Sequence, residues 1–221
     1  MKSRSFSIPG VFVALAVLAT LACVPGCNIM GPIFLMVHGP EKQPQEYALD
    51  PKRSVVVFVD DRSNILPRRS IRQMIGEAAQ KQLIASGEVQ NVIDCRGALA
   101  AAARDKFDQP QSIVDIARSV QAEVLIYASV EQFTLSADGQ SMSPEASVWV
   151  KVIDAVSEKR LWPEDEKSGK RIAIHPQFEQ GFVPKSQADV AKAENAVAER
   201  LGIAIAQLFY EHEQYQSELR P

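Results

Sequence analysis

The stretch "SVVVFVD", from Ser54 to Asp60, decides the fold class of this chain. It is apolar and rich in β-branched residues up to its last position, which is typical of a strand covered on both faces. The residues after it predict a helix that opens at Pro67 and ends at Gly87. Its apolar residues recur at four-residue spacing: Ile71, Ile75, Ala79 and Leu83. A strand of this kind followed by an amphipathic helix predicts an α/β fold.

The chain then continues to alternate between strand and helix patterns. Val89 to Asp94 predicts a second strand, and the alanine-rich residues 97–106 predict a second helix. A third helix is expected with Asp108 as its N-cap. Two longer strands are predicted next, and a last helix follows a polar stretch: Glu123 to Leu135, Ala146 to Asp154, and Gln187 to about Gln214. The order β-α-β-α-α-β-β-α indicates a single α/β domain with a mixed sheet of about four to five strands and helices packed on it.

The strand from Ala146 to Asp154 alternates with period two. One face carries Ala146, Val148, Val150 and Val152, and the other carries Ser147, Trp149 and Lys151. We expect this strand to pair with the preceding one as an antiparallel hairpin, because only a turn-rich segment joins them.

The N-terminal region, "LATLACVPGCNIMGPIFLMVHGP" at positions 18–40 and the residues before it, resembles an export signal. Its apolar run from Val11 to Val24 would span about 21 Å as a helix, against a hydrocarbon core of roughly 30 Å. A longer helix would have to pass through Pro25-Gly26 and Gly31-Pro32, where each proline removes a backbone donor. A short signal core after a basic start is therefore favoured over a membrane-spanning helix.

The segment "VPGC", from Val24 to Cys27, resembles the lipobox of bacterial lipoproteins. That resemblance implies cleavage before Cys27 and several acyl chains, palmitate among them, on this residue. The alternative acylation site is Cys23 in "TLAC". The alternative to a lipoprotein is a plain exported protein with an ordinary cleaved signal and an incidental cysteine. The expected organisation is a signal peptide at residues 1–26, a lipid-attached tether at 27–50 and the α/β domain at 51–221. The apolar stretch Ile33 to Val37 would then lie at the bilayer or against a partner.

Composition limits the range of partners. The chain has 24 basic and 27 acidic residues, a formal net charge of −3, so it lacks the basic footprint of a nucleic-acid-binding protein. Nucleic acid is therefore not expected as a partner. Its 3 cysteines are too few for a disulfide framework.

Two segments carry a family resemblance: "IARSVQAEVLIYASV" (Ile116 to Val130) and "VWVKVIDAVSEKRLWPED" (Val148 to Asp165). They resemble bacterial envelope proteins with a domain like the amino-terminal domain of TolB, a group that includes curli-secretion lipoproteins and lipoprotein activators of penicillin-binding proteins. The similar region covers about residues 53 to 213. The chain departs from the pattern at Gln121 and at Ser157-Glu158, where glycine is usual.

This resemblance implies a function without catalysis. The family has no shared set of catalytic residues, and its common activity is the binding of other envelope proteins. No cofactor is expected for this chain. We therefore expect a non-enzymatic lipoprotein that is exported and lipid-anchored to a bacterial membrane, the outer membrane facing the periplasm being favoured. It would act as a protein-binding or assembly module whose partners are the bilayer and another envelope protein. A homo-oligomer is also compatible with the resemblance.

Four arginines flank the end of the first strand and the start of the first helix: Arg62, Arg68, Arg69 and Arg72. Helix N-termini favour anions, so an anion- or small-ligand-binding domain that uses Arg62, Arg68 and Arg69 is the alternative function. Neutralisation of nearby carboxylates is the simpler role for these side chains.

The acidic pair Asp60 and Asp61 is a weak candidate for a metal site, because paired carboxylates at the carboxyl end of a strand can hold Mg²⁺. The start of a solvated loop is the favoured interpretation. A metal-dependent enzyme would need His175 or other carboxylates to converge on this pair. No metal-binding motif links His38, His175 and His212, and Cys95 is expected to be a buried thiol.

Overall fold

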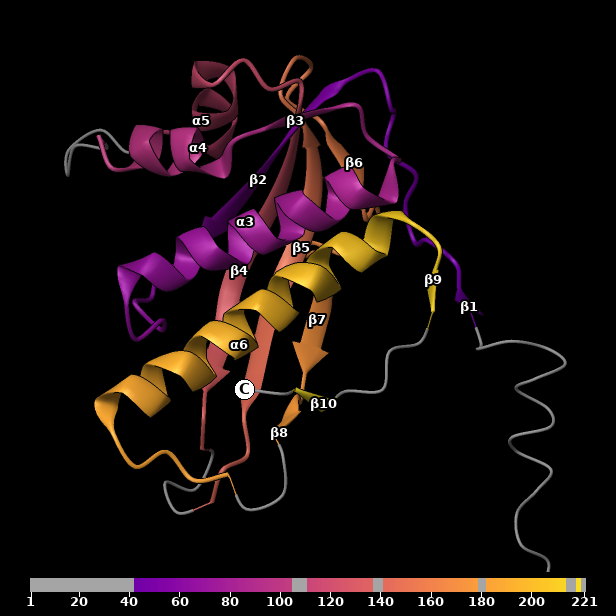
Figure 1. The fold of residues 1–221 in the computed structure, drawn as a ribbon. Coiled ribbons are helices and arrows are strands. Elements are labelled where there is room, and N and C mark those ends of the chain that lie inside the picture. The colour runs from indigo at the N-terminus through magenta and orange to yellow at the C-terminus, as the bar shows by residue number, and fades with distance from the viewer. Residues whose placement is uncertain (1–41, 105–110, 137–140, 179–181, 214–217, 220–221) are drawn as a thin grey trace, which may run out of the picture. The chain divides into compact units, whose positions relative to one another are not determined.

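The centre of the fold is a six-stranded mixed sheet with the strand order β3-β2-β4-β5-β6, in which β7 also pairs with β5 (Figure 1). The computed structural model describes residues 42–104, 111–136, 141–178, 182–213 and 218–219. The strands are β2 (Ser54–Asp60), β3 (Asn91–Ile93), β4 (Val124–Thr134), β5 (Glu145–Asp154), β6 (Arg160–Trp162) and β7 (Lys170–Ile174). β2 is parallel to β3 and β4, whereas β5 is antiparallel to β4, β6 and β7.

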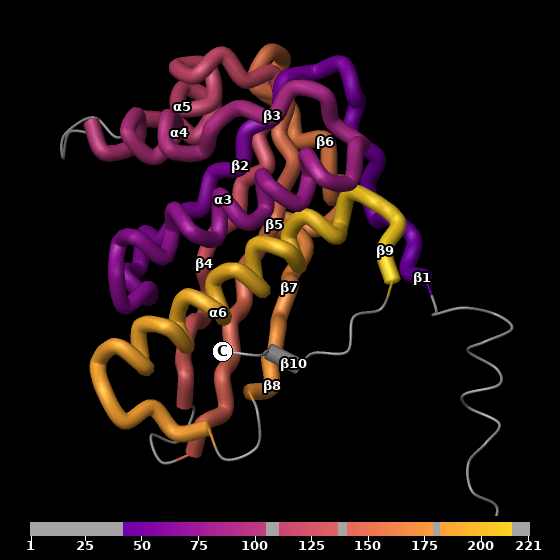
Figure 2. The backbone as a smooth tube through the Cα atoms, in the orientation of Figure 1, coloured from indigo at the N-terminus to yellow at the C-terminus, as the bar shows by residue number. Residues whose placement is uncertain are grey.

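Helices cover the two faces of this sheet unequally. The helices are α3 (Arg69–Ser86), α4 (Cys95–Ala102), α5 (Ile113–Ser119) and α6 (Gln187–Ala206), which continues into the 3-10 helix η1 (Gln207–Phe209). The long helices α3 and α6 lie side by side across one face (Figures 1 and 2). The short helices α4 and α5 pack on the other face, where their main strand contacts are with β2 and β4. Two small strand pairs complete the structure: β1 (Lys42–Gln43) with β9 (His212–Glu213), and β8 (Gln177–Phe178) with β10 (Glu218–Leu219).

The alternation of β2 between two apolar cores explains its continuously apolar sequence. Val55, Val57 and Val59 pack under α3 and α6, whereas Val56 and Phe58 pack under α4 and α5. The predicted stripe of α3 is confirmed, since Ile71, Ile75, Ala79 and Leu83 are all fully buried in the first core. Strand β2 therefore contributes apolar side chains to both cores, as a strand covered on both faces does.

A glycine allows α3 and α6 to approach closely. A Cβ atom at Gly202 would lie 2.4 Å from the Ile75 carbonyl oxygen and 2.7 Å from the Ala78 Cβ. Because no side chain is present there, the backbone of α6 can rest on the backbone of α3. This contact sets how α6 lies on the sheet.

The predicted α/β class and the predicted order of elements are confirmed, with differences in extent. The sheet has six strands because β6 and β7 form within the stretch expected to be polar loop. The last helix ends at Ala206, and only η1 and β9 follow it before residue 214. The cap of α5 is Ser112, whose hydroxyl accepts from the Asp115 N–H, whereas Asp108 lies outside the described residues. Side-chain caps are short-range contacts, so several polar residues before a helix can compete for that role.

Part of the segment expected as a tether packs on the domain. β1 pairs with β9, and the N–H groups of Glu46 and Tyr47 both donate to the Leu208 carbonyl. The Tyr47 ring lies 6.1 Å from the Trp162 ring, and Trp162 also meets Phe209. Trp162 therefore fastens the chain before β2 to the chain after α6.

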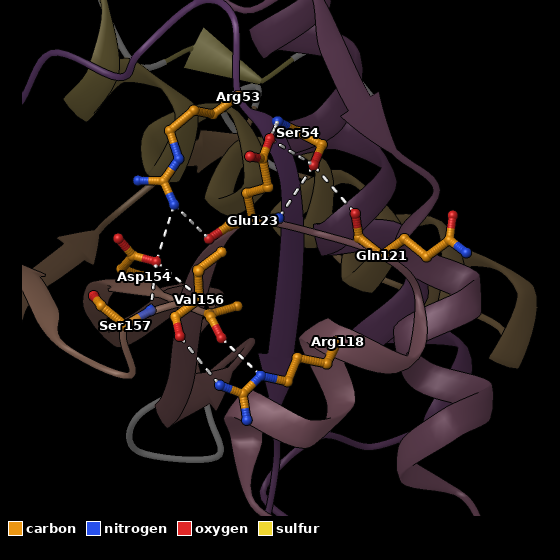
Figure 3. A network of polar contacts seen from close by, with 9 residues as sticks. Arg53, Ser54, Arg118, Gln121, Glu123, Asp154, Val156 and Ser157 are labelled. Carbon is orange, nitrogen blue, oxygen red and sulfur yellow. Dashed lines mark hydrogen bonds and ion pairs between the residues drawn. The ribbon is translucent and has the colours of Figure 1, made fainter.

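A polar network holds the amino-terminal end of β2 and β4 (Figure 3). Arg53 forms a 3.0 Å ion pair with Asp154 and donates to the Glu123 carbonyl, while the Glu123 carboxylate accepts from the Ser54 N–H at 2.9 Å. Arg118 of α5 donates to the Ala155 carbonyl at 2.8 Å. Ala122 and Glu123, which lie within the first of the two family-like segments, are thus part of the contact between α5, β2 and β5.

The two departures from the family pattern both occupy the left-handed region of the backbone. Gln121 and Glu158 each have a φ of 61°. A glycine adopts this conformation without steric cost, which explains why glycine is usual at such turns. The turns form here with larger residues, at a local energetic cost.

Candidate functional site

Asp60 lies at the end of β2 with its carboxylate buried among polar partners, so its interpretation as the start of a solvated loop is wrong. The Tyr127 hydroxyl donates to Asp60 Oδ2 at 2.7 Å, and Arg62 Nε donates to the same oxygen at 2.8 Å. Arg72, from the first turn of α3, donates to the Val59 carbonyl at 2.9 Å and lies 3.9 Å from Asp60 Oδ1. The Asp60 charge is thus balanced by groups of the chain itself.

Tyr127 joins this cluster from the neighbouring parallel strand. Its partner in the β2–β4 register is Phe58, and the two rings lie 6.2 Å apart. Burial, together with the hydrogen bond to Asp60 and the charge of Asp60, raises the pKa of Tyr127 to about 12. The Tyr127 hydroxyl therefore stays protonated and acts as a donor at any physiological pH.

Asp61 has a different role from Asp60 although the two are adjacent. Its carboxylate accepts from the N–H of Ile65 at 2.7 Å and from the N–H of Leu66 at 3.1 Å, so it organises the loop that leads to α3. Across the described residues no group of three or more His, Cys, Asp or Glu side chains is arranged to hold a metal ion. His175 lines a separate pocket with Glu145 and Phe178.

The four predicted arginines point to different partners. Arg62 and Arg72 contact Asp60, as described, whereas Arg68 forms a 2.8 Å ion pair with Glu194 of α6 and donates to Asn195. Arg69 is exposed at the start of α3. The arginine cluster of the sequence is therefore divided between the end of β2, the α3–α6 contact and the surface.

Of the three cysteines, Cys95 lies among the described residues. Cys95 is buried at the start of α4 against Gly76, and burial, with the nearby charges of Asp94 and Glu77, raises the pKa of its thiol to about 11. Its prediction as a buried thiol is confirmed. Cys23, Cys27, the stretch from Ile33 to Val37 and His38 lie outside the described residues. Within the described part, no helix is both long and apolar enough to cross a membrane.

A larger candidate site is the part of the sheet that α4 and α5 leave uncovered. The main helix contacts of β5 and β7 come from α6, on the opposite face. We call the uncovered part the open face. The strand register assigns to it Ser129 of β4, Ser147, Trp149 and Lys151 of β5, and Arg171 and Ala173 of β7. Glu131 lies at an irregularity of β4 and belongs to the same face through its contacts with Ser147 and Arg171. Glu131, Arg171 and Ala173 are exposed, Ser129, Trp149 and Lys151 are half-buried, and Ser147 is buried beneath its neighbours.

Polar side chains on the open face are already ordered by one another. Glu131 forms a salt bridge with Arg171 and accepts from the Ser147 hydroxyl at 2.8 Å. The hydrogen bond from Arg171 is the main cause that lowers the pKa of Glu131, so this pair stays charged at neutral pH. A surface with fixed charges and a half-buried Trp149 has the composition of a protein-binding surface.

The sequence contained a signal for this face. The alternation of β5 assigned Ser147, Trp149 and Lys151 to one side, but alternation does not show whether a helix covers that side. Only the positions of α4 and α5 show that it is open.

Comparison with known proteins yields structural similarity alone. No family model and no curated protein matches the sequence. Solved structures that are similar include a PelC dodecamer from Paraburkholderia phytofirmans, at 15% identity with a TM-score of 0.43, covering 77% of this chain and 97% of that one. Lipoprotein GNA1162 from Neisseria meningitidis matches at 11% identity with a TM-score of 0.38, covering 64% of this chain and 91% of that one.

TolB from Acinetobacter baumannii is also similar, at 11% identity with a TM-score of 0.32, and covers 76% of this chain and 31% of that one. These names include a lipoprotein and TolB, the kinds of protein that the resemblance in the sequence named. The likeness is one of fold.

Proposed function

We propose that this protein is a non-enzymatic envelope lipoprotein whose α/β domain binds another envelope protein through the open face. The observation that carries the proposal is the unequal covering of the sheet: α3 and α6 bury one face, whereas the other keeps Trp149 and the paired side chains of Glu131 and Arg171 accessible. A partner could dock on this face without rearrangement of the domain, because its charged side chains are already held in place.

The cell would hold the domain in position by lipid at Cys27. In this proposal residues 1–26 are removed on export, Cys27 is acylated, and the following residues connect the bilayer to the domain in the periplasm, the outer membrane being favoured. Several acyl chains would give stable anchoring, since each buried CH₂ contributes about 0.8 kcal/mol.

Mass analysis of the mature N-terminal peptide tests the anchor. The expected result is an acylated Cys27 at the N-terminus, and an unmodified N-terminus elsewhere would overturn it. Cys27→Ala should release the protein from membranes, whereas Cys95→Ala, a matched variant within the domain, should leave it membrane-bound. If the Cys27→Ala variant stayed bound to membranes, Cys23 would be the acylated residue.

Site-specific photocrosslinking in intact cells tests the binding surface. A photoreactive amino acid placed at Ala173, on the open face, should give an adduct with a discrete protein. The same probe at Ile84, which is 55% exposed on α3, serves as the control position. If adducts formed from Ile84 and none from Ala173, the partner would bind near α3 and the proposal of the open face would be wrong.

The alternative function, an anion- or small-ligand-binding domain, rests on one observation at α3. The side chain of its N-cap residue, Arg68, makes no capping hydrogen bond, and the first turn contains no acidic residue. The first residue of the helix, Arg69, is exposed. A thermal-shift titration with inorganic phosphate and sulfate would test it. A shift that is lost in Arg69→Ala but kept in the exposed control Arg104→Ala would favour this alternative, and no shift would remove its support.

A further inference from the structure

Two cations on the open-face side of the sheet lack a carboxylate partner. Among the described residues, Lys151 forms no ion pair, and Arg160 donates only to main-chain carbonyls, those of Glu166 at 2.7 Å and Lys167 at 3.0 Å. Arg62 and Arg171 on the same side are both paired with acids. Lys151 and Arg160 are therefore two positive charges that no carboxylate among the described residues neutralises.

These two cations belong to one face. Arg160 of β6 is the register partner of Ile153, which lies two residues after Lys151 on β5. Alternation along β5 puts Ile153, Lys151 and Trp149 on the same side of the sheet. Arg160 thus extends the open face beyond Lys151 toward the edge of the sheet.

Lys151 is held in a partly desolvated position. Gly169, with a φ of 102°, brings its backbone against the side chain, since a Cβ there would lie 2.9 Å from Lys151 Cγ. Burial first, and then the charge of Arg160, lower the pKa of Lys151. The domain keeps a cation where solvation is reduced and a like charge is near, so an anionic group from outside would be favourable there.

Trp149 supplies an apolar contact next to these charges. It is half-buried on β5, opposite Ser129 on one side and Arg171 on the other. Residues two apart on a strand are separated by about 7 Å. Trp149 and Lys151 are therefore as far apart as two successive side chains on one side of an extended peptide. The open face therefore presents the aromatic ring of Trp149 next to the cationic side chains of Lys151 and Arg160.

We propose that Trp149, Lys151 and Arg160 recognise an acidic segment of the partner protein, one that carries two or more carboxylates beside an apolar side chain. This inference rests on the proposed function, because it names the chemistry of the partner at the open face. Charge complementarity gives the acidic character, and the strand spacing favours an extended protein segment over a compact anion.

Photocrosslinking from Ala173 in the full-length protein, in intact cells, tests the inference. The double variant Lys151→Gln/Arg160→Gln is compared with Lys52→Gln/Lys81→Gln, which removes two exposed lysines elsewhere. We expect the adduct yield to fall about tenfold in the first pair, since loss of two charge contacts weakens docking. The yield of the control pair should match that of the unchanged protein. Mass spectrometry should place the crosslink in a segment rich in Asp and Glu.

A charge-reversal experiment gives a second readout. Lys151→Glu/Arg160→Glu should abolish the adduct, and lysines in place of the acidic residues of the crosslinked segment should restore it. Unfolding temperatures of all variants would confirm that the domain is intact.

Each contrary outcome has a distinct meaning. An undiminished adduct in Lys151→Gln/Arg160→Gln overturns the acidic-segment inference while protein binding at the open face stands. Adducts with lipid or glycan alone overturn the inference and the proposed function together, and so does the lack of any adduct from Ala173 and from Ile84.

Discussion

The Tyr127 hydroxyl donates a 2.7 Å hydrogen bond to the carboxylate of Asp60, and the bond joins two neighbouring parallel strands at the edge of the second core. Asp60 is one of three polar or charged residues buried in the described part of the chain, at 6% exposure. Its negative charge is tolerated because Tyr127 and Arg62 both donate to it.

Tyr127→Phe should therefore destabilise the domain by about 1–3 kcal/mol, because a buried carboxylate oxygen loses a donor. The free energy of unfolding in urea measures the effect. Tyr47→Phe is the matched control, since no described hydrogen bond uses its hydroxyl, and it should change stability less. If the two substitutions lowered the free energy of unfolding equally, the hydrogen bond from Tyr127 to Asp60 would not contribute to stability.

The ion pair between Arg53 and Asp154 predicts a specific acid sensitivity. Burial alone would raise the pKa of Asp154, but hydrogen bonds from Arg53 and from the N–H groups of Ser157 and Val156 lower it from 3.8 to about 2. A folded-state pKa below the unfolded one stabilises the protein fully above pH 3.8, and that stabilisation is lost as pH falls through about 2.

Asp154→Asn should accordingly cost about 1–2 kcal/mol at pH 7. The difference in unfolding free energy between the original protein and this variant should narrow between pH 4 and pH 2. Comparison with the variant isolates Asp154 from the other carboxylates that titrate in this range. A difference that stays constant down to pH 2 would contradict the role assigned to the ion pair.

The close approach of α3 and α6 predicts intolerance of a methyl group at Gly202. Gly202→Ala should lower stability by about 1–3 kcal/mol despite the better helix propensity of alanine, because the new Cβ would meet the Ile75 carbonyl. Thermal unfolding measures the change. Gly97→Ala in α4 is the matched control, since its new Cβ would meet only the Val120 side chain, at 3.1 Å. If both variants unfolded at the same temperature, the backbone contact would not be as close as described.

The left-handed conformation of Gln121 predicts a stabilising substitution. Gln121→Gly should raise the unfolding free energy by about 0.5–1 kcal/mol, because relief of the left-handed strain exceeds the added freedom of the unfolded chain. Gln90 is exposed and has no positive φ, so Gln90→Gly should lower stability by about 0.4–1 kcal/mol. Chemical denaturation should thus show changes of opposite sign in the free energy of unfolding of the two variants. A lower free energy of unfolding in Gln121→Gly would contradict a strained backbone at Gln121.

Local patterns determined much of the fold. The apolar run of β2, the stripe of α3 with Gly87 at its end, and the alternation of β5 each depend on residues a few positions apart, so they could be read directly. The strands β6 and β7 could not be read in this way. They are short and half-buried, and they form because β5 offers an unpaired edge, which is a property of the assembled sheet.

The same distinction between local patterns and tertiary structure applies to the candidate site. The sequence by itself determined which residues alternate on β5, the net negative charge and the signal-like N-terminus with Cys27. Only the tertiary structure decided that the arginines near β2 separate to different partners and that the face of Trp149 and Lys151 stays open. The physical reason is that charge pairing and helix coverage depend on distances between segments far apart in the chain, which no local pattern contains.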